Sequence, residues 1–308
     1  MLDIGWFLQY NFHFKKYYTN LIEVSALFGS IKCFKYLMMN GKEINESTCK
    51  FAVAGGNLEI IHLCEQQGLQ FEDCLYISSY YHRFELFEWL NTHFGYDEIS
   101  LTEFIYCYNE PLFYSYSLSG SNVETKDEDG RTPLNNASSI GHLEVVKYLY
   151  ETCHANVETK ENKGHTPINN ASENGHLEVV KYLYETCHAN VETKDNDGFT
   201  PINNASLRGH LEVVKYLYET CHANVETKDE DGNTPINNAT YNGNFEIVKY
   251  LYETCHADVE TKDNKGRNPI NNAFQNDRLD IIKYLYETCH ANVETKDEDG
   301  HTPINNAT

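Results

Sequence analysis

Residues Asp195 to Lys228 read D-N-D-G-F-T-P-I-N-N-A-S-L-R-G-H-L-E-V-V-K-Y-L-Y-E-T-C-H-A-N-V-E-T-K, a 34-residue unit that the chain repeats. The glycine of its D-N-D-G turn returns every 34 positions, at Gly130, Gly164, Gly198, Gly232, Gly266 and Gly300. A period of this length is typical of solenoids, in which a unit cannot bury its apolar face alone and buries it against its neighbours. The sequence therefore predicts a stack of repeated units.

Each unit carries residue types that mark a turn, a helix start and a helix end. Asp127-Glu128-Asp129-Gly130 predicts a turn whose glycine takes a positive φ and joins two short extended pieces into a β-finger. Thr132-Pro133 predicts a helix start, because the hydroxyl caps free N–H groups and proline suits the first helical position. Gly141 is expected to end that helix, and the apolar residues from Leu143 to Tyr150 lie on two faces of a second helix. Neighbours are therefore expected on both sides of the second helix.

The repeated pattern resembles a known family. D-x-x-G-x-T-P-[LI]-x-x-A, followed by G-H-L-E-V-V-K-Y-L and A-N-V-E, is similar to the ankyrin repeat, closely over residues 120–308 and loosely over 21–119. The chain also resembles a type of ankyrin-repeat protein from protozoan parasites, in which a divergent helical segment precedes near-identical copies. The resemblance implies an all-α solenoid of helix-turn-helix units with short β-hairpin fingers, and protein binding on its concave face. Two positions depart from the family pattern: Asn135 replaces a histidine that ties adjacent loops together, and Cys153-His154 replaces a glycine after the second helix.

The N-terminal part carries the same unit in a more divergent form. Copies are recognisable at Ser25–Gly41, at Phe51–Gly68 and from about residue 76 to 90, where His82 stands in the place of the helix-ending glycine. Because these copies are shorter, we expect them to keep the two helices without the finger. A looser copy spans residues 101–119, where Pro111 is expected to interrupt the helical pattern.

These copies predict the domain organisation. Aromatic residues are frequent in residues 1–20, which we expect to form a helical cap on the stack. Residues 1–119 are then a segment of divergent ankyrin-like units with this N-terminal cap. Residues 120–308 are predicted to form regular 34-residue repeats, five complete and a sixth truncated.

Charge and hydropathy limit the kinds of partner. The chain carries 46 acidic and 24 basic residues, a formal net charge of −22, which repels phosphate backbones and favours a partner protein with a basic surface. No stretch approaches the ~18–20 consecutive apolar residues that span a bilayer, and the first residues lack a secretory signal pattern. We therefore expect no nucleic-acid binding, no membrane insertion and a cytoplasmic location.

Residues with reactive or metal-binding side chains are also part of the repeat. A cysteine precedes a histidine once per unit, at Cys153, Cys187, Cys221, Cys255 and Cys289. Stacked helices lie ~8–10 Å apart, too far for disulfides between equivalent cysteines, and the pairs lack converging zinc ligands. The turn at Asp195–Gly198 lacks the other ligands of a calcium loop, and its carboxylates are expected to be solvated. Because no catalytic group is singular, we expect no enzyme activity, no metal and no cofactor.

The paired asparagines of each first helix suggest a structural role. An amide both donates and accepts, so one asparagine per unit could form a hydrogen-bonded ladder along the stack. A polar lining without such a ladder is the alternative.

The units differ from one another mainly directly after the turn glycine and near the end of the first helix. The resemblance to ankyrin repeats implies that these positions line the concave face and the finger bases, where partners bind. Exposed aromatic and arginine residues are common interface anchors, so we expect a partner-binding surface there. Neutral drift at exposed sites is the alternative. The predicted residues are Arg131, Ile140, His165, Glu173, Phe199, Leu207, Arg208, Asn233, Tyr241, Arg267 and Gln275.

The expected function is therefore that of a non-catalytic scaffold or adaptor that binds a partner protein. A structural spacer or self-associating array without a dedicated partner is the alternative. Since the sequence stops at Thr308 inside a sixth first helix, we expect a fragment of a longer array, with an uncovered end that frays or associates end to end.

Overall fold

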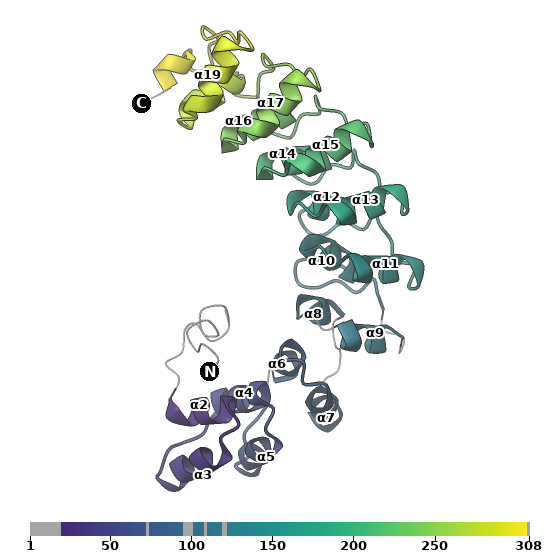
Figure 1. Cartoon of the computed structure of the whole chain (residues 1–308), viewed down its shortest axis with the longest axis vertical. Helices are drawn as coiled ribbons and strands as arrows, with labels where there is room; N and C mark the ends of the chain where they lie inside the picture. The colour runs from purple at the N-terminus through teal and green to yellow at the C-terminus, as the bar shows by residue number, and fades with distance from the viewer. Residues whose placement is uncertain (1–19, 72–73, 95–100, 108–109, 119–121, 307–308) are drawn as a thin grey trace. The chain divides into compact units, whose positions relative to one another are not determined.

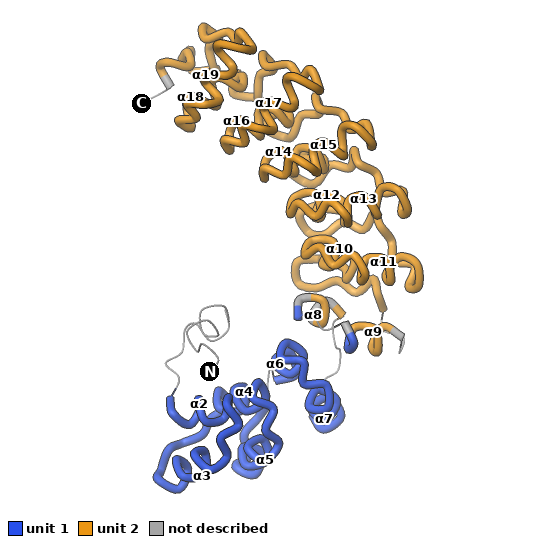
Figure 2. Tube along the Cα trace, in the orientation of Figure 1, with its two compact units in different colours: residues 1–99, 107–112 blue, residues 100–106, 113–308 orange. Residues whose placement is uncertain are grey.

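The computed structural model describes residues 20–71, 74–94, 101–107, 110–118 and 122–306 (Figure 1). The chain divides into two compact units, unit 1 with residues 1–99 and 107–112, and unit 2 with residues 100–106 and 113–308 (Figure 2). Helices are the regular secondary structure of the described residues, which confirms the all-α fold class. The cap predicted for residues 1–20 lies, apart from Asn20, outside the described residues.

Unit 1 is built from helix pairs. Its first helices are α2 (Leu21–Leu27), α4 (Glu46–Gly55) and α6 (Cys74–Tyr80), and each packs on the helix that follows it: α3 (Ile31–Met39), α5 (Leu58–Gln66) and α7 (Phe84–Phe94). His82 between α6 and α7 has a φ of 54°, which confirms that it takes the left-handed conformation of the missing glycine. The largest buried side chains of this unit are those of Phe34, Phe51, Phe71 and Phe87.

Unit 2 continues the same pairing in two rows (Figure 1). The first helices are α8 (Leu101–Tyr106), α10 (Pro133–Ile140), α12 (Pro167–Glu173), α14 (Pro201–Arg208), α16 (Pro235–Asn242) and α18 (Pro269–Gln275). The second helices are α11 (Leu143–Glu151), α13 (Leu177–Glu185), α15 (Leu211–Glu219), α17 (Phe245–Glu253) and α19 (Leu279–Glu287). A short 3₁₀ helix, η1 (Pro303–Asn306), contacts α18. Packing runs from each first helix to the next and from each second helix to the next.

The helix α9 (Glu110–Leu118) is divided between the two units, and it corrects one expectation. Pro111 is the second residue of α9 and does not interrupt a helix. A proline in the first turn costs little, because N–H groups there have no acceptor inside the helix.

The helix starts and ends of unit 2 follow the sequence. The Thr132 hydroxyl accepts the N–H of Asn135 (3.3 Å), and Pro133 is the first residue of α10. Gly141 ends α10 with a φ of 81°. Leu134 and Ala137 are fully buried on the inward side of α10, as predicted. Local capping therefore sets where each first helix begins and ends, and its apolar residues pack against the neighbouring helices.

The expected β-fingers are turns without strands in the described residues. Within one unit, Asp195 N–H donates to Phe199 O (3.0 Å) and Gly198 N–H to Asp195 O (3.2 Å). Between units, Asn196 N–H donates to the carbonyl oxygen of Lys163 (2.9 Å). The segment before the finger, expected to be extended, is another turn at Asn190–Thr193. One closing bond per finger is too few for a strand ladder, because the chain turns again within a few residues.

The Cys-His pair ends each second helix and reverses the chain. His154, His188, His222, His256 and His290 all have φ between 54° and 57°. Histidine therefore takes the left-handed position that glycine usually occupies, at a cost in backbone strain. Burial raises the pKa of the preceding thiols of Cys187, Cys221 and Cys255 to about 12. These cysteines are packing residues and not reactive thiols at neutral pH.

Candidate functional site

An aspartate at the start of a turn holds the turn together, and Asp195 shows how. Its Oδ1 accepts the N–H groups of Asp197 (3.0 Å) and Phe199 (2.8 Å), and its side chain is 1% exposed. The prediction that the turn carboxylates are solvated is therefore wrong for this residue, although Asp197 is exposed. The equivalent acids are buried as well: Glu161, Asp229 and Asp263. The sequence carries their signal, a constant position three residues before the turn glycine.

The second asparagine of the first helix ties this buried acid to the helix. Asn204 Nδ2 donates to Asp195 Oδ2 (3.3 Å), and Asn238 Nδ2 donates to Asp229 Oδ2 (3.1 Å). The fifth repeat departs from the pattern, since Arg267 Nη2 lies 2.7 Å from the acid's Oδ2 and the buried amide of Asn272 has no hydrogen-bond partner among the described residues. The second repeat departs as well, because Asn170 Oδ1 lies 3.3 Å from His165 Nδ1.

The first asparagine of each pair links one unit to the next. Asn203 Oδ1 accepts the N–H of Thr200 (3.4 Å), and its Nδ2 donates to the carbonyl oxygen of Thr227 in the following unit (3.1 Å). Asn169 and Asn237 donate to the equivalent carbonyl oxygens at 3.2 and 3.3 Å. The first asparagine, at the position of the family's loop-tying histidine, thus bonds each unit to the next through a backbone carbonyl oxygen. A ladder of asparagine amides along the stack stays a prediction.

Several predicted site residues form one ionic network across consecutive units. Arg131 Nε donates to the buried Glu161 of the next unit. His165 Nε2 lies 3.0 Å from Asp195 Oδ2 in the unit after that, and its Nδ1 lies 3.4 Å from Glu161 Oε1. Glu173 joins the network at 3.5 Å from His165 Nδ1. In these two repeats the residue after the turn glycine thus pairs with the buried acid of the following turn, whereas Arg267 pairs with Asp263 of its own turn.

The network sets the charge of its histidine. Burial disfavours the imidazolium, but the hydrogen bond and charge of Asp195, with the charges of Glu173 and Glu161, outweigh burial and raise the pKa of His165. Burial likewise opposes ionisation of Asp195, but the hydrogen bonds from His165 and Phe199 leave its pKa lowered. A charged pair is therefore favoured at this position.

The predicted residues after the turn glycine contact the predicted residues near the end of the first helix. Arg267 Nη1 donates to Gln275 Oε1 at 2.6 Å, and His165 contacts Glu173 in the same way within its own repeat. Arg208, 55% exposed, bridges repeats through its Nη2, 2.6 Å from Glu173 Oε1.

The other predicted residues are exposed or intermediate in burial. Tyr241 is 48% exposed. Intermediate burial is shared by Ile140, Phe199, Leu207 and Asn233. The role of all these residues in partner binding stays a prediction.

Asp229 differs from the other buried acids. Glu161, Asp195 and Asp263 each lie within 4.0 Å of an arginine or histidine, whereas Asp229 has no ion-pair partner among the described residues. Asn233 N–H donates to Asp229 Oδ1 at 2.8 Å, and burial raises the pKa of this carboxyl. Phe199 and Asn233 occupy the positions where an arginine or histidine stands in other repeats. The buried carboxyl of Asp229, in the middle of the row of turns, therefore has no cationic side chain beside it among the described residues.

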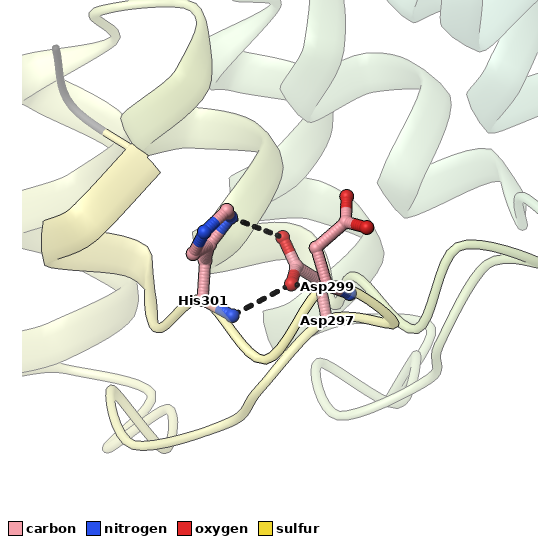
Figure 3. A group of neighbouring side chains, drawn as sticks. All are labelled: Asp297, Asp299 and His301. Atoms are coloured by element: carbon pink, nitrogen blue, oxygen red, sulfur yellow. Dashed lines mark hydrogen bonds and ion pairs between the residues drawn. The ribbon is translucent and has the colours of Figure 1, made fainter.

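One cluster has the donor types of a metal site, although no metal was predicted. Asp297, Asp299 and His301 each offer a ligand atom, and these atoms all lie within 4.8 Å of one another (Figure 3). Asp297 Oδ1 accepts the N–H groups of Asp299 (3.1 Å) and His301 (2.8 Å). The same two bonds occur at the turn of Asp195, where no histidine stands, so the turn itself accounts for this grouping.

Family comparisons cover most of the chain. The family described as ankyrin repeats (3 copies) matches residues 104–195 and 187–263, and ankyrin repeats (many copies) matches 243–286. A domain of unknown function (DUF3447) matches residues 39–116. No significant match was found among curated proteins. None of the described helices combines the length and the apolar character needed to cross a membrane.

Proposed function

The chain belongs to the ankyrin-repeat family, with an N-terminal DUF3447 domain, and from this premise we propose that unit 2 binds a partner protein on its concave face. Ankyrin repeats are generally protein-binding modules and usually non-catalytic, and no catalytic domain was detected. The proposed surface comprises the turns and the first helices α10, α12, α14, α16 and α18. We name it the first-helix face.

The observation that carries the proposal is the contrast between a buried polar framework and a variable surface above it. The asparagines of the first helices and the acids of the turns are buried and hydrogen-bonded, so they hold the loops in place. The residues that differ between units lie beside this framework, and they include Phe199, Leu207 and Tyr241. Rigid aromatic side chains lose little conformational entropy on binding and are common hot spots.

Charge supports a basic partner. The chain has a formal net charge of −22, and Asp229 holds a buried carboxyl without a cation near Phe199 and Asn233. An arginine or lysine of the partner would supply there what Arg131 supplies to Glu161. Binding is therefore expected to weaken as salt increases, because surface charges are screened within about 10 Å at 0.1 M salt.

The test uses the double change Phe199→Ala with Tyr241→Ala. A partner is captured from cell extract with the whole chain, identified by mass spectrometry and titrated against both proteins. We expect the double change to weaken binding at least about tenfold without lowering the melting temperature. Tyr286→Ala is the matched control, because Tyr286 is 57% exposed but lies in the second helix α19. Equal affinity for the double variant and the control would reject this surface.

A self-associating spacer is the second candidate, favoured by the repetition of identical bonds between units. The Nζ atoms of Lys126, Lys160 and Lys194 each donate to the carbonyl oxygen of the lysine one unit further on, at 2.7 to 2.8 Å. Sedimentation velocity over a hundredfold concentration range separates the candidates. A monomer that binds its captured partner supports the adaptor, and concentration-dependent assembly without a partner supports the spacer.

A further inference from the structure

The first helix pair of unit 1, α2 and α3, carries an apolar groove of about 490 Å³ (Figure 1). Its apolar lining comes from both helices: Leu21, Val24 and Phe28 of α2, and Cys33, Tyr36 and Leu37 of α3. Leu21 is 71% exposed and Tyr36 is 67% exposed. Large apolar side chains that gather on one surface commonly mark an interaction site.

The groove lies on the side of α2 and α3 that corresponds to the packed side of the next helix pair. Ser30, which lines the groove, is the N-cap residue of α3, and Asn57 is the N-cap residue of α5. Asn57 Nδ2 donates to the carbonyl oxygen of Gly29 in the preceding pair (3.2 Å), and α5 packs on α3. The equivalent side of α2 and α3 is therefore one on which a helix can pack.

The charge in the groove is opposite to the charge at the equivalent place in the stack. Glu59, the second residue of α5, accepts a hydrogen bond from the Lys35 ammonium group of α3. The second residue of α3 is Lys32, which lines the groove, is exposed and has no ion-pair partner among the described residues. A helix that packs on α3 as α3 packs on α5 would therefore bring an acidic residue to Lys32.

The shape of the groove favours a single helix over a tightly stacked pair. A Cβ added at Gly55, the last residue of α4, would lie only 2.5 Å from the carbonyl oxygens of Ala26 and Leu27. Phe28, 55% exposed, stands at the equivalent place, directly before the left-handed Gly29. Because its ring holds a neighbour further away than Gly55 does, the groove stays wide enough for one helix to lie in it.

We propose that this groove binds an amphipathic helix of a partner protein, with an acidic residue beside the apolar face of that helix. Apolar side chains three, four and seven positions apart on the partner helix cover Leu21, Phe28 and Tyr36, and its carboxylate pairs with Lys32. This partner is acidic, whereas the first-helix face of unit 2 is proposed to bind a basic one. The inference therefore does not depend on the proposed function of unit 2.

The first test titrates a fluorescent synthetic helix with the full chain. The probe has about 20 residues, which is long enough for a helix in water, with leucine along one face and glutamate beside it. Lys32→Glu should weaken binding about fivefold, because an attractive contact becomes repulsive. Lys42→Glu is the matched control: Lys42 is exposed and does not line the groove, yet its change alters the net charge equally.

A second probe with lysine in place of glutamate should reverse the order and bind the Lys32→Glu chain more tightly than the Lys42→Glu chain. Equal affinities of the two chains for both probes would exclude an acidic residue at Lys32 and overturn the proposal.

The apolar contacts are tested by Leu21→Ser with Tyr36→Ser in the full chain. Binding of the glutamate probe should weaken at least about tenfold, because exposed apolar area is no longer there to be buried. Leu58→Ser is the control, since Leu58 is 54% exposed but belongs to α5 and does not line the groove. Equal affinity for the double variant and this control would reject the groove as the binding site.

A readout on the unchanged chain keeps the test decisive if a variant fails to fold. Cys33 is an exposed cysteine in the groove, so the bound glutamate probe should slow its maleimide alkylation at least about tenfold. The rate at Cys153, in unit 2, should not change. An unchanged rate at Cys33 under saturating probe would place the bound helix elsewhere and overturn the proposal.

Sedimentation velocity without the probe tests the other occupant, a second copy of the chain. A dimer that forms as the concentration rises and is lost with Leu21→Ser and Tyr36→Ser would assign the groove to a second copy and overturn the proposal. A monomer in both chains, with Cys33 protected by the probe, supports a groove that binds a partner helix.

Discussion

Two helix pairs, α4–α5 in unit 1 and α14–α15 in unit 2, have the same type of connection between their two helices, which we call the joint. In both pairs a glycine in the left-handed conformation ends the first helix, Gly56 with a φ of 72° and Gly209 with a φ of 88°. In both, the next residue reaches back to a carbonyl oxygen of the preceding pair. Asn57 Nδ2 donates over 3.2 Å, and His210 Nε2 lies 2.9 Å from its carbonyl oxygen. The joint is therefore independent of the rest of the repeat.

The two pairs differ in what precedes them and in what they bury. Only residues 40–45 separate α3 from α4. Residues 186–200, which we call the turn arm, separate α13 from α14 and include the buried Asp195. The buried Asn203 and Asn204 follow the turn arm in α14 itself. The core of unit 1 is rich in phenylalanine, and the regular repeats bury leucine, isoleucine, valine and alanine beside their polar framework. A stacked helix pair thus requires only buried apolar side chains and a residue in the left-handed conformation between its two helices. The turn arm adds hydrogen bonds between consecutive repeats. These bonds stabilise the folded chain only while each buried polar group keeps its partner.

The largest effect is expected in the phenylalanine core of unit 1. Phe51 is 1% exposed, so Phe51→Ala should lower the free energy of unfolding by about 3–5 kcal/mol through lost burial and a cavity. Urea unfolding with hydrogen exchange resolved by residue measures the loss and locates it. Ile202→Val in unit 2 is the control, with an expected loss of about 0.5–1.5 kcal/mol. A similar loss for both changes would remove the contrast between the two cores.

The next effect tests the polar framework of unit 2. Asn203→Leu leaves the Thr200 N–H and the Thr227 carbonyl oxygen without their amide partner, at an expected cost of about 2–3 kcal/mol. Asn272→Leu is the matched control, because its buried amide has no partner to lose, and it should be neutral or stabilising. Urea midpoints of the two variants give the comparison. Equal losses would show that the hydrogen bonds between units contribute nothing beyond side-chain volume.

A smaller effect depends on pH. Because the folded state raises the pKa of His165 above its ordinary value of 6.5, protonation favours folding. This stability is fully present below pH 6.5 and is lost as the pH rises through the folded-state pKa. His165→Gln should therefore cost about 1 kcal/mol at pH 6 and little at pH 9, as measured by thermal unfolding at both values. Asn233→Gln, at the equivalent position, should show no such difference, and a loss for His165→Gln independent of pH would exclude the ionic network as its cause.

The smallest effect tests the histidines that have a left-handed backbone conformation, in the regular repeats and in unit 1. His188 has a φ of 55°, so His188→Gly should stabilise the chain by about 0.5–1 kcal/mol by relieving backbone strain. The same change at His82 should stabilise unit 1, because His82 also takes a left-handed conformation. His210→Gly is the opposite control: at a φ of −89° glycine relieves nothing and the bond to the preceding unit is lost. Melting temperatures that fall for His188→Gly and His82→Gly would contradict this account.

The repeat, the helix boundaries and the left-handed residues between helices could be predicted from the amino-acid sequence. Thr132, Pro133 and Gly141 act through their own backbone and nearest turn, so their effect can be read from local chemistry. The bond from each first asparagine to the next unit recurs for the same reason that the stack does: each unit is a copy of its neighbour, so a donor in one faces the same acceptor in the next.

Which polar residues are buried, and which of them form pairs, depends on how the units stack. Asp195 and Asp197 are the same residue type two positions apart, yet one is enclosed by α14 and the other is exposed. The contact of His165 with Asp195 joins two units, and its distance depends on how closely those units stack. Burial and ion pairing depend on residues that are far apart in the sequence, so they cannot be predicted from the type of one residue.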